Sequence, residues 1–335
     1  MRYIGNKTKL LRFIAGVLRR RGIRGGSAVD PFSGTASVAR ELKRLGFRVV
    51  AADLMEYAHV FAKAYVEATH LPASLPARLE ALNRLPGAPG FVSQHFALPA
   101  RMYFTAGNAE RIDAMRAQIH AWQCSQQIGA SETYLLLTAL IEASDRVANT
   151  TGVYAAYVKS WQPNACRPLE LRVPRVVEGN GCHAYRADAV ELVAQLDEFD
   201  LLYLDPPYNA RQYAGYYHIP ELLAMGWFDK LPTLRGKTGL LPDRDKRSDW
   251  SRRAKCEAAL ERLVASARCK HIVMSYNAEG LLNEAAIERI FKQYGRRDTY
   301  QRYVRTYRRY RSDADGEHRR YAGDRVEEYL YCVAR

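Results

Sequence analysis

The tetrapeptide Asp205-Pro206-Pro207-Tyr208 brings together residue types that could do chemistry on an amine. It follows the apolar segment 200–204, which predicts a buried strand. Two consecutive prolines fix the backbone and remove two N–H donors, which leaves a rigid loop offering a carboxylate, carbonyl oxygens and an aromatic ring. Asp205 and a proline carbonyl could each accept a hydrogen bond from a planar group bearing –NH₂, while Tyr208 stacks on its ring. Acceptors placed there would stabilise the positive charge that develops as the amine attacks a methyl group.

A plain Pro-Pro turn after a buried strand would contain the same four residues, so the surrounding sequence has to decide. The segment 30–36 (Asp-Pro-Phe-Ser-Gly-Thr-Ala) follows a predicted strand and opens a helix, and its small residues would let the backbone approach a cofactor. Asp53 ends the next predicted strand, where an acid can hold ribose hydroxyls, although it could equally cap a helix. These features fall at the carboxyl ends of successive strands, which places them on one edge of a sheet.

The elements that must position these residues alternate between strand and helix. Strands are expected at 27–31, 47–52, 182–186, 200–204, 271–276 and 327–333, and helices at 34–45, 55–69, 189–196 and 278–291. Between them, prolines interrupt the chain from 70 onward, helical patterns follow at 105–122 and 131–147, and 153–180 has no regular pattern. The polar, basic stretch 230–256 is expected to be a mobile loop. The pattern predicts a doubly wound α/β sheet with a largely helical insertion.

The order of these motifs resembles that of the D12-class (alpha-type) N6-adenine-specific DNA methyltransferases. In that family an N-terminal motif, a Pro-Phe-x-Gly loop, an acid after the second strand, a recognition insert and Asp-Pro-Pro-Tyr follow one another. Here they correspond to residues 2–7, 30–36, 53, 70–180 and 205–208. The resemblance implies a Rossmann-like class I methyltransferase sheet formed by 1–69 and 181–335, and an inserted helical target-recognition region at 70–180.

The resemblance also implies roles in binding S-adenosyl-L-methionine. Tyr3 and Lys7 would contact this cofactor, Lys7 through the cofactor's carboxylate. The cradle would be formed around Asp30, Phe32 and Gly34, and Asp53 would bind the ribose. Asp188 would face the adenine amine, whereas its position alone predicts the N-cap of the helix 189–196. This chain departs from the family at Ala36, where a second glycine is usual.

The implied reaction needs a base that has been flipped out of a duplex. It therefore needs contacts to phosphates, and an intercalating side chain would assist it. Two stretches combine basic and aromatic residues, 235–255 and 296–320, and the chain carries a net charge of +14. Such residues can clamp phosphates and stack on bases, although a solvated, charged face would look alike. The candidate nucleic-acid contacts are Lys237, Arg244, Lys246, Arg247, Arg305, Tyr307, Arg308 and Arg309.

The sequence therefore predicts a site-specific DNA adenine methyltransferase that acts on N6 of a flipped-out adenine. Three alternatives stay open: an RNA base (adenine-N6) methyltransferase, a cytosine-N4 enzyme, and a catalytically silent nucleic-acid-binding protein of the same fold. The intact 205–208 motif argues against the silent protein, the motif order favours adenine, and the large insert and basic tail favour double-stranded DNA. A cognate restriction endonuclease is a possible partner, and we expect a monomer.

Cysteine and histidine spacing predicts no metal site. The 6 cysteines include no C-x-x-C pair and the 8 histidines are scattered, so reduced thiols are expected. No run of 18 apolar residues is present, which predicts no membrane span. Residues 1–11 have neither a continuous apolar region nor a small-residue cleavage site, so we expect a cytoplasmic protein.

Overall fold

The computed structural model describes residues 1–242, 246–308 and 325–335. The chain divides into two compact units, which we describe separately. The helical unit comprises Met1–Asn6, Met55–Glu178 and Tyr213–Lys246. The sheet unit comprises Lys7–Leu54, Gly179–Gln212 and Arg247–Arg335.

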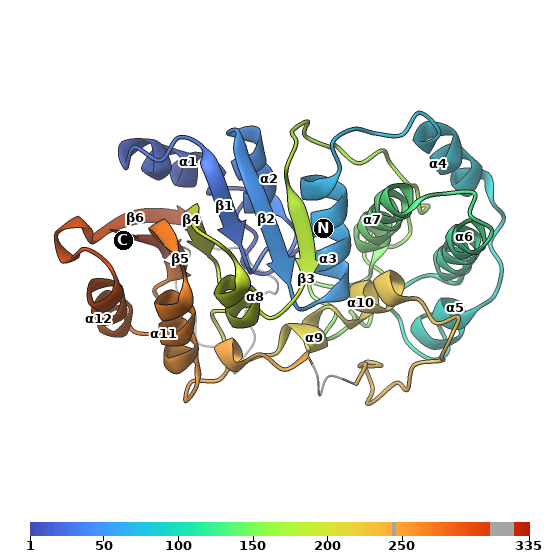
Figure 1. Ribbon diagram of the computed structural model, residues 1–335. Helices are drawn as coiled ribbons and strands as arrows, with labels where there is room; N and C mark the ends of the chain where they lie inside the picture. The colour runs from blue at the N-terminus through green and yellow to red at the C-terminus, as the bar shows by residue number, and fades with distance from the viewer. Residues whose placement is uncertain (243–245, 309–324) are drawn as a thin grey trace. The chain divides into compact units, whose positions relative to one another are not determined.

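The sheet unit is built on one mixed sheet, in which the described residues form seven strands in the order β3-β2-β1-β4-β5-β7-β6 (Figure 1). Neighbours from β3 to β5 pair in parallel, whereas β7 pairs antiparallel with both β5 and β6. The strand order reverses between β1 and β4, the position at which doubly wound sheets bind ligands. The strands are β1 (Gly26–Asp30), β2 (Phe47–Asp53), β3 (His183–Arg186), β4 (Phe199–Leu204), β5 (Cys269–Asn277), β6 (Gln301–Arg308) and β7 (Arg325–Ala334).

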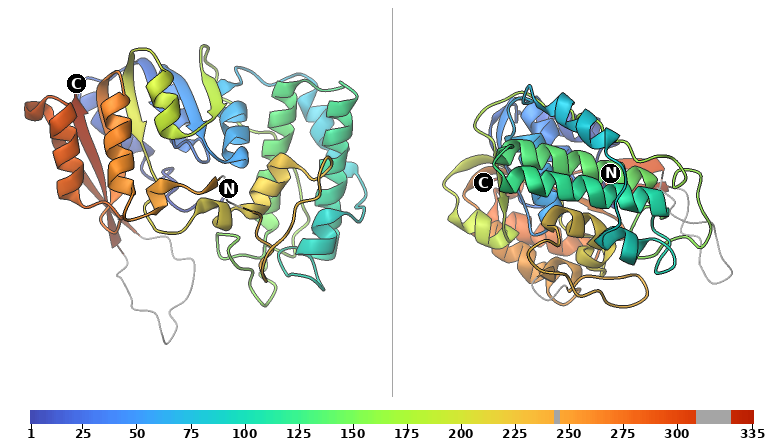
Figure 2. Two further views of the ribbon diagram at one scale, coloured as in Figure 1. Left: turned by 60° about the horizontal axis from the view of Figure 1, so that its bottom comes forward. Right: turned by 90° about the vertical axis from the view of Figure 1, so that its right-hand side faces the viewer.

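Helices cover both faces of this sheet (Figures 1 and 2). On one face lie α8 (Ala189–Gln195), α11 (Cys256–Ser266) and α12 (Glu284–Tyr294), and on the other α1 (Leu11–Arg20) and α2 (Ser37–Arg44). Leu260, Leu263 and Val264 of α11 recur at helical spacing and are fully buried in the core between sheet and helices. Short 3₁₀ turns at Asp249–Ser251 and Arg297–Thr299 complete the unit.

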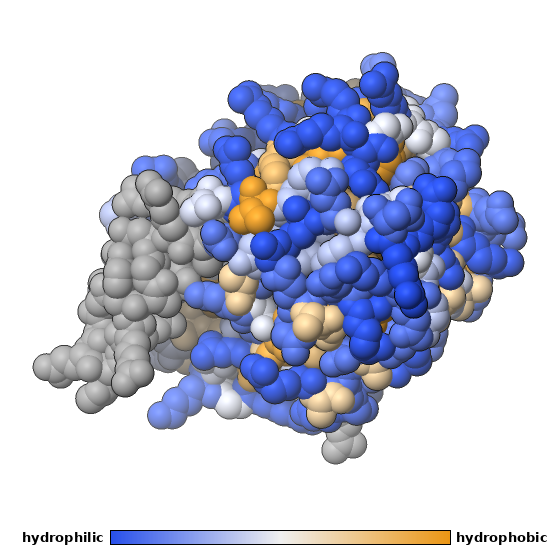
Figure 3. Space-filling view, turned by 90° about the vertical axis from the view of Figure 1, so that its left-hand side faces the viewer, coloured by the Kyte–Doolittle hydropathy of each residue, from blue (hydrophilic) through white to orange (hydrophobic). Residues whose placement is uncertain are grey.

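The outer side of α12 is charged and solvated. Arg289 pairs with Glu257 at 3.0 Å, and Lys292 pairs with Glu288 at 2.5 Å. Figure 3, which looks at the end of the sheet carrying β6 and α12, shows a mostly hydrophilic surface with scattered apolar residues. Scattered apolar residues are ordinary on a protein surface. This face therefore offers no large apolar patch in the part of the chain that the structure describes.

The helical unit is organised around α7 (Ala130–Val147), most of which is buried. It packs against α3 (Glu56–Ala62), which continues as a π-helical turn at Lys63–Glu67, and against α4, α6 and α10. The remaining helices of this unit are α4 (Leu75–Arg84), α5 (Phe91–Phe96), α6 (Ala106–Cys124), α9 (Tyr213–Tyr216) and α10 (His218–Met225). Within the described residues, no helix is both long and apolar enough to cross a bilayer.

The predicted α/β class is confirmed, but the compact units do not follow the expected boundaries. Residues 55–69 and 213–246 belong to the helical unit, because α3 and α10 pack on α7 and on each other. The helix expected at 278–291 begins only at Glu284, where the Asn283 side chain accepts a hydrogen bond from the N–H of Ala286 at 2.7 Å. Residues 278–283 instead form a turn that contacts the candidate site.

Candidate active site

Four acidic residues follow the four adjacent parallel strands at one edge of the sheet. Asp30 ends β1 and Asp53 ends β2, while Asp188 and Asp205 come shortly after β3 and β4. Because these strands run parallel and neighbour one another in the sheet, their carboxyl ends share one edge. The acids therefore lie along one edge of the sheet, as the sequence predicted.

The Asp205–Tyr208 loop leaves β4 at the switch point between β1 and β4. The Asp205 side chain is 18% exposed, whereas Tyr208 is only 8% exposed. The Tyr208 carbonyl accepts a hydrogen bond from the N–H of Leu281 at 3.0 Å, and its ring packs edge-on against Tyr276 with centroids 5.0 Å apart. The carboxylate thus reaches the surface while the tyrosine ring is held inside.

A buried polar cluster ties this loop to Lys7, whose side chain is 3% exposed. The Lys7 ammonium lies 3.1 Å from Asp205 Oδ1 and 2.9 Å from Glu328 Oε1, and it donates a hydrogen bond to the Tyr208 hydroxyl. Burial lowers the pKa of Lys7, but Asp205 and Glu328 together outweigh it and leave that pKa raised. Lys7 is therefore charged, and it neutralises part of a two-carboxylate site.

This cluster gives Lys7 three partners within the protein. An ammonium has three N–H donors, and here three protein acceptors surround it. Binding a cofactor carboxylate would require Lys7 to give up Asp205, Glu328 or Tyr208. In this geometry Lys7 holds the Asp205 loop. Its contact with the cofactor's carboxylate stays a prediction from the resemblance.

The Tyr208 hydroxyl lies between two carboxylates, at 2.5 Å from Asp205 Oδ1 and 2.9 Å from Glu328 Oε1. It has one proton, so it can donate to only one of them at a time. Burial raises the pKa of Asp205 to about 7, Lys7 opposes that shift, and Glu328 adds to it. Asp205 is thus a carboxyl group that changes charge near neutral pH.

The loop after β1 bends through two residues in the left-handed region. Gly34 has φ of 49° and Ala36 has φ of 57°. The N–H of Gly34 donates to Asp53 Oδ2 at 3.0 Å, which joins the ends of β1 and β2. A left-handed conformation costs alanine on the order of 1 kcal/mol more than glycine, and this accounts for the glycine usual at position 36. Ala36 thus adopts a left-handed conformation that favours glycine.

The remaining members of the predicted cradle are arranged around that loop. Asp30 is 2% exposed, and burial followed by the charge of Asp205 raises its pKa well above its usual value. Phe32 packs edge-on against Trp250 with centroids 4.8 Å apart. Ser33 Oγ is buried and has no hydrogen-bond partner among the residues that the structure describes. Buried hydroxyls are normally paired, so this one suits a ligand that supplies a partner.

Asp188 caps the helix that follows it. Its Oδ1 accepts hydrogen bonds from the N–H groups of Val190 at 2.8 Å and Glu191 at 3.3 Å. That is the role which its position alone predicts. A cap uses one carboxylate oxygen, so a further contact through the other oxygen stays a prediction from the resemblance.

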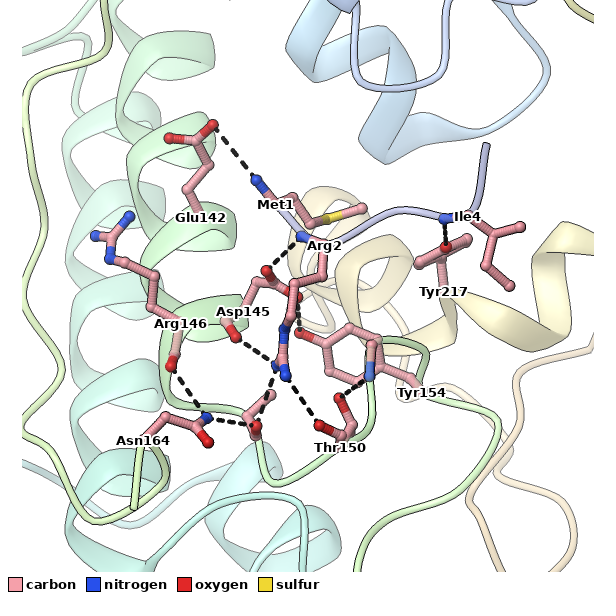
Figure 4. A network of polar contacts seen from close by, with 12 residues as sticks. Met1, Arg2, Ile4, Glu142, Asp145, Arg146, Thr150, Tyr154, Asn164 and Tyr217 are labelled. Carbon is pink, nitrogen blue, oxygen red and sulfur yellow. Dashed lines mark hydrogen bonds and ion pairs between the residues drawn. The ribbon is translucent and has the colours of Figure 1, made fainter. Parts of the chain in front are cut away.

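Tyr3 belongs to the helical unit, where it stacks on Tyr217 with centroids 4.6 Å apart and lies against Tyr57 and Tyr213. Its place is fixed by Arg2, whose guanidinium donates to the carbonyls of Asp145, Ala148 and Thr150 at 2.7–3.1 Å (Figure 4). These carbonyls lie at and beyond the end of α7, where a cation is favourable.

The predicted nucleic-acid contacts separate into four groups. Lys237, Arg247 and Arg305 are exposed. Tyr307 and Arg308 belong to β6, whereas Arg244 and Arg309 lie outside the described residues. The prediction for Lys246 is wrong, because its ammonium is buried against Glu221 Oε1 at 2.6 Å and against the Met225 sulfur at 3.2 Å. A phosphate could reach Lys246 only by breaking that buried ion pair.

Lys237 occupies a tight turn in which Arg235 and Leu240 exchange two backbone hydrogen bonds of 2.9 Å. Side chains from other segments of the helical unit hold the carbonyl groups of this turn. Arg101 donates to the Gly236 and Lys237 carbonyls at 3.2 and 3.0 Å, and Tyr103 and His218 contact the Thr238 carbonyl. The exposed Lys237 ammonium is thus carried on a backbone held by several contacts rather than on an unsupported loop.

Sequence reasoning missed Glu328, which is fully buried and contacts both Lys7 and Tyr208. A charged residue in an alternating strand pattern is normally placed on the solvent face, so no local signal marks it. Its neighbour Glu327 is exposed, as that alternation requires. Only the pairing of β7 with β5 brings Glu328 to the site.

We predict that Gly280→Ala destabilises the turn against which Tyr208 rests. An added methyl group would overlap Cε1 of Tyr276, a rigid ring that is 1% exposed. Overpacking of this kind costs roughly 2 kcal/mol in free energy of unfolding, measured by urea denaturation. Gly16→Ala is the matched control, because it meets nothing within 4 Å in α1 and should stabilise that helix by up to about 1 kcal/mol. Equal stabilities of the two variants would contradict the assignment.

The sheet unit has the doubly wound α/β architecture, with acids along the carboxyl edge of its parallel strands. The D12 class N6 adenine-specific DNA methyltransferase family matches residues 3–290 of this chain. Type II methyltransferase M.NlaIII of Neisseria lactamica is 34% identical over 100% of this chain and 99% of its own length. Type II methyltransferase M.FokI of Planomicrobium okeanokoites is also 34% identical, over 100% of this chain and 53% of its own length. Modification methylase StsI of Streptococcus sanguinis is 32% identical over 88% of this chain.

The chain therefore belongs to the D12 class of N6 adenine-specific DNA methyltransferases. It is a DNA adenine methyltransferase. This family membership decides among the alternatives that the sequence left open, in favour of adenine over cytosine, of DNA over RNA, and of an enzyme over a silent binding protein.

Proposed function

We propose that the chain binds S-adenosyl-L-methionine over the loop 31–36, with Asp53 holding its ribose and Asp188 its adenine amine. The residues present suit such a ligand. Asp53 is half-buried at the end of β2, and Ser33 Oγ is a buried hydroxyl with no partner among the described residues. Acids in this position bind ribose hydroxyls in doubly wound folds. When bound, the cofactor supplies the methyl group that is transferred. Tyr3 stays a predicted contact of the same ligand.

The observation that carries the proposed chemistry is the partly exposed Asp205 carboxylate at the β1/β4 switch point. In its ionised form Asp205 accepts an N–H of the adenine amine, and the Pro206 carbonyl accepts the other. Both acceptors stabilise the positive charge that develops on N6 during transfer. Pro207 keeps the loop rigid, so the acceptors are in place before the base arrives.

Stacking of the base on Tyr208 needs a change from the geometry described above. The ring is 8% exposed, and its hydroxyl is held by Lys7, Asp205 and Glu328. An incoming amine would compete with the Tyr208 hydroxyl for Asp205. We propose that this exchange frees the tyrosine to contact the base.

The substrate proposed here is double-stranded DNA, from which the adenine is flipped out. Relatives that span the whole chain are named Type II methyltransferases, which favours a site-specific modification enzyme with a cognate restriction endonuclease. Exposed Lys237, Arg247 and Arg305 would contact phosphates. We propose that it acts as a monomer, because one methyl transfer needs one site.

The proposal is tested by incubating the protein with methyl-labelled S-adenosylmethionine and either duplex DNA or RNA of matched sequence. Label is expected in the DNA alone, and nucleoside analysis should assign it to N6-methyladenine. Label in RNA, in cytosine or in neither polymer would overturn the proposal. Equilibrium binding of the cofactor to Asp53→Ala, expected to be weaker by at least about tenfold, tests the ribose contact separately.

Methyl transfer is expected to lose rate below about pH 7. Burial raises the pKa of Asp205 to about 7, so at lower pH the group is protonated and no longer stabilises positive charge on the amine. With both substrates saturating, kcat should fall about tenfold per pH unit on the acid side and level off above the midpoint. A kcat that is constant from pH 5.5 to 8 would show that Asp205 does not titrate in the working range.

Lys237→Ala is expected to weaken DNA binding on all sequences alike and to reduce the dependence on salt. Removing one phosphate contact lowers the slope of log Kd against log salt concentration by about 1. Lys292→Ala removes the same charge from α12, where Lys292 is paired with Glu288, and should leave the slope unchanged. Identical slopes for the two variants would remove Lys237 from the proposed interface.

A further inference from the structure

Glu328 presents a buried charge that neither the family motifs nor the proposed mechanism uses. It lies on β7, opposite Asn277 of β5. The family match ends at residue 290, before this strand. Its Oε1 lies 2.9 Å from the Lys7 ammonium and accepts hydrogen bonds from Ser275 Oγ at 2.6 Å and Tyr208 at 2.9 Å. Its Oε2 is buried and has no hydrogen-bond partner among the described residues.

Stability alone does not account for a second carboxylate here. Lys7 and Asp205 form a neutral pair without Glu328, and burying a further charge is unfavourable unless it is well compensated. An uncharged acceptor would satisfy Ser275 and Tyr208 equally well. What only a carboxylate provides is an additional negative charge, shared across one ammonium with Asp205.

We propose that Glu328 is a positioning residue for methyl transfer, which holds Lys7 and Tyr208 and divides the Lys7 charge between two carboxylates. Asp205 then keeps a negative potential toward the amine instead of being neutralised by Lys7. In the absence of Glu328, Lys7 would pair with Asp205 alone, and Asp205 would be a weaker acceptor for a positively charged nitrogen. This inference rests on the proposed role of Asp205 in methyl transfer.

Several described groups of the sheet unit set the electrostatic surroundings of Asp205. The charged or titratable groups that face it from the N-terminal segment and from β1, β4, the loop after β4 and β7 include Lys7, Asp30, Tyr203, Tyr208 and Glu328. Of these, Lys7 favours the ionised form of Asp205, whereas Glu328 disfavours it. Removing the Glu328 charge should therefore make Asp205 more acidic.

The test compares Glu328→Gln with the wild-type enzyme across pH. Glutamine keeps the shape and an acceptor for Ser275 but removes the charge. We expect the acid limb of the kcat–pH profile to move to lower pH by about one unit. We also expect kcat on the plateau to fall at least about tenfold, while KM for DNA and the Kd for S-adenosylmethionine change by less than about threefold. A purely structural role would not move the acid limb.

Glu327→Gln is the matched control, because it removes the same charge one residue away on the exposed side of β7. The acid limb of the kcat–pH profile of Glu327→Gln should coincide with that of the wild type. If Glu328→Gln does not fold, Glu328→Asp keeps the charge, and its acid limb should stay at the wild-type pH while plateau kcat falls. Carboxyl NMR titration of Asp205 in each folded variant gives the same shift without turnover.

An acid limb and an Asp205 titration unchanged in folded Glu328→Gln would overturn this inference, and so would a limb in Glu328→Asp that moves to lower pH. Failure of the proposed function is distinguishable, because it would appear as absent adenine methylation in the wild-type enzyme. A wild type that methylates adenine, with Glu328→Gln unshifted, rejects the Glu328 role alone.

Discussion

Replacing Asp205 by alanine is expected to lower kcat for methyl transfer by roughly three orders of magnitude. The change removes the carboxylate that we propose accepts the amine N–H and faces the developing positive charge. Cofactor affinity should change by less than about threefold, because the loop 31–36 and Asp53 are left intact. Single-turnover methylation of duplex DNA measures the first quantity and equilibrium binding of S-adenosylmethionine the second.

Asp200→Ala is the matched control, because it removes a carboxylate from the opposite end of the same strand. Asp200 pairs with Lys270 at 2.7 Å and accepts the N–H of Ser27 at 2.8 Å, contacts that hold strands rather than substrate. Its kcat should stay at the wild-type level. A loss of cofactor binding in Asp205→Ala would instead make Asp205 a cofactor or folding residue, and residual transfer above about a tenth of the wild-type rate would remove it from the chemistry.

Replacing Lys7 by methionine is expected to lower the free energy of unfolding by about 3–5 kcal/mol at pH 8. The variant leaves the buried Glu328 and the partly exposed Asp205 without their shared cation. Burial already raises the pKa of Asp205 to about 7, and loss of Lys7 raises that pKa further. The rate of methyl transfer should also fall, because the Asp205 loop loses its contact with Lys7.

The sign of the pH dependence follows from that raised pKa. A carboxyl group whose folded pKa exceeds its unfolded value favours the folded state below the unfolded pKa, and this contribution is lost as pH rises through the folded pKa. The penalty of Lys7→Met should therefore be smaller at pH 5.5 than at pH 8 when both are measured by urea unfolding. Lys292→Met on the surface of α12 should cost less than about 1 kcal/mol at either pH. A Lys7→Met penalty equal at both pH values would contradict the charged cluster.

The sequence predicted that these acids gather at one edge of the sheet, because each follows a strand and strand ends are visible in a local pattern. Asp30, Asp53 and Asp205 needed only the apolar runs before them and the rule that parallel strands end together. Asp188 caps α8, as its position alone predicts, while its contact with the cofactor's adenine amine stays a prediction. Local periodicity was sufficient wherever the functional group sits next to the element that positions it.

The contacts between segments far apart in the chain could not be predicted in this way. Lys7 meets Asp205 across 198 positions, and Glu328 joins them only through the antiparallel pairing of β7 with β5. Lys246 shows the opposite error, because its basic neighbours suggested solvent whereas Glu221 holds it inside. A sequence does not show whether a charged residue has a partner in the folded protein. For this reason Glu328 was missed and Lys246 was expected to be exposed.

The unit boundaries were misplaced for a related reason. Helix α3 continues the strand–helix rhythm of the sheet in sequence, so residues 55–69 were expected to belong to it. In the structure α3 packs on α7 and α10, and Glu221 accepts the N–H groups of Glu56 and Tyr57 at the start of α3 at 3.1 Å. Which neighbour a helix packs against is a tertiary property that its own period does not encode.

The most direct test of the central claim is to map modified bases in DNA from cells that express the wild-type protein or Asp205→Ala. The account predicts N6-methyladenine at one short recurring sequence in the wild type and its absence in the variant. Methylation on cytosine, no modification by the wild type, or equal methyladenine with Asp205→Ala would contradict it.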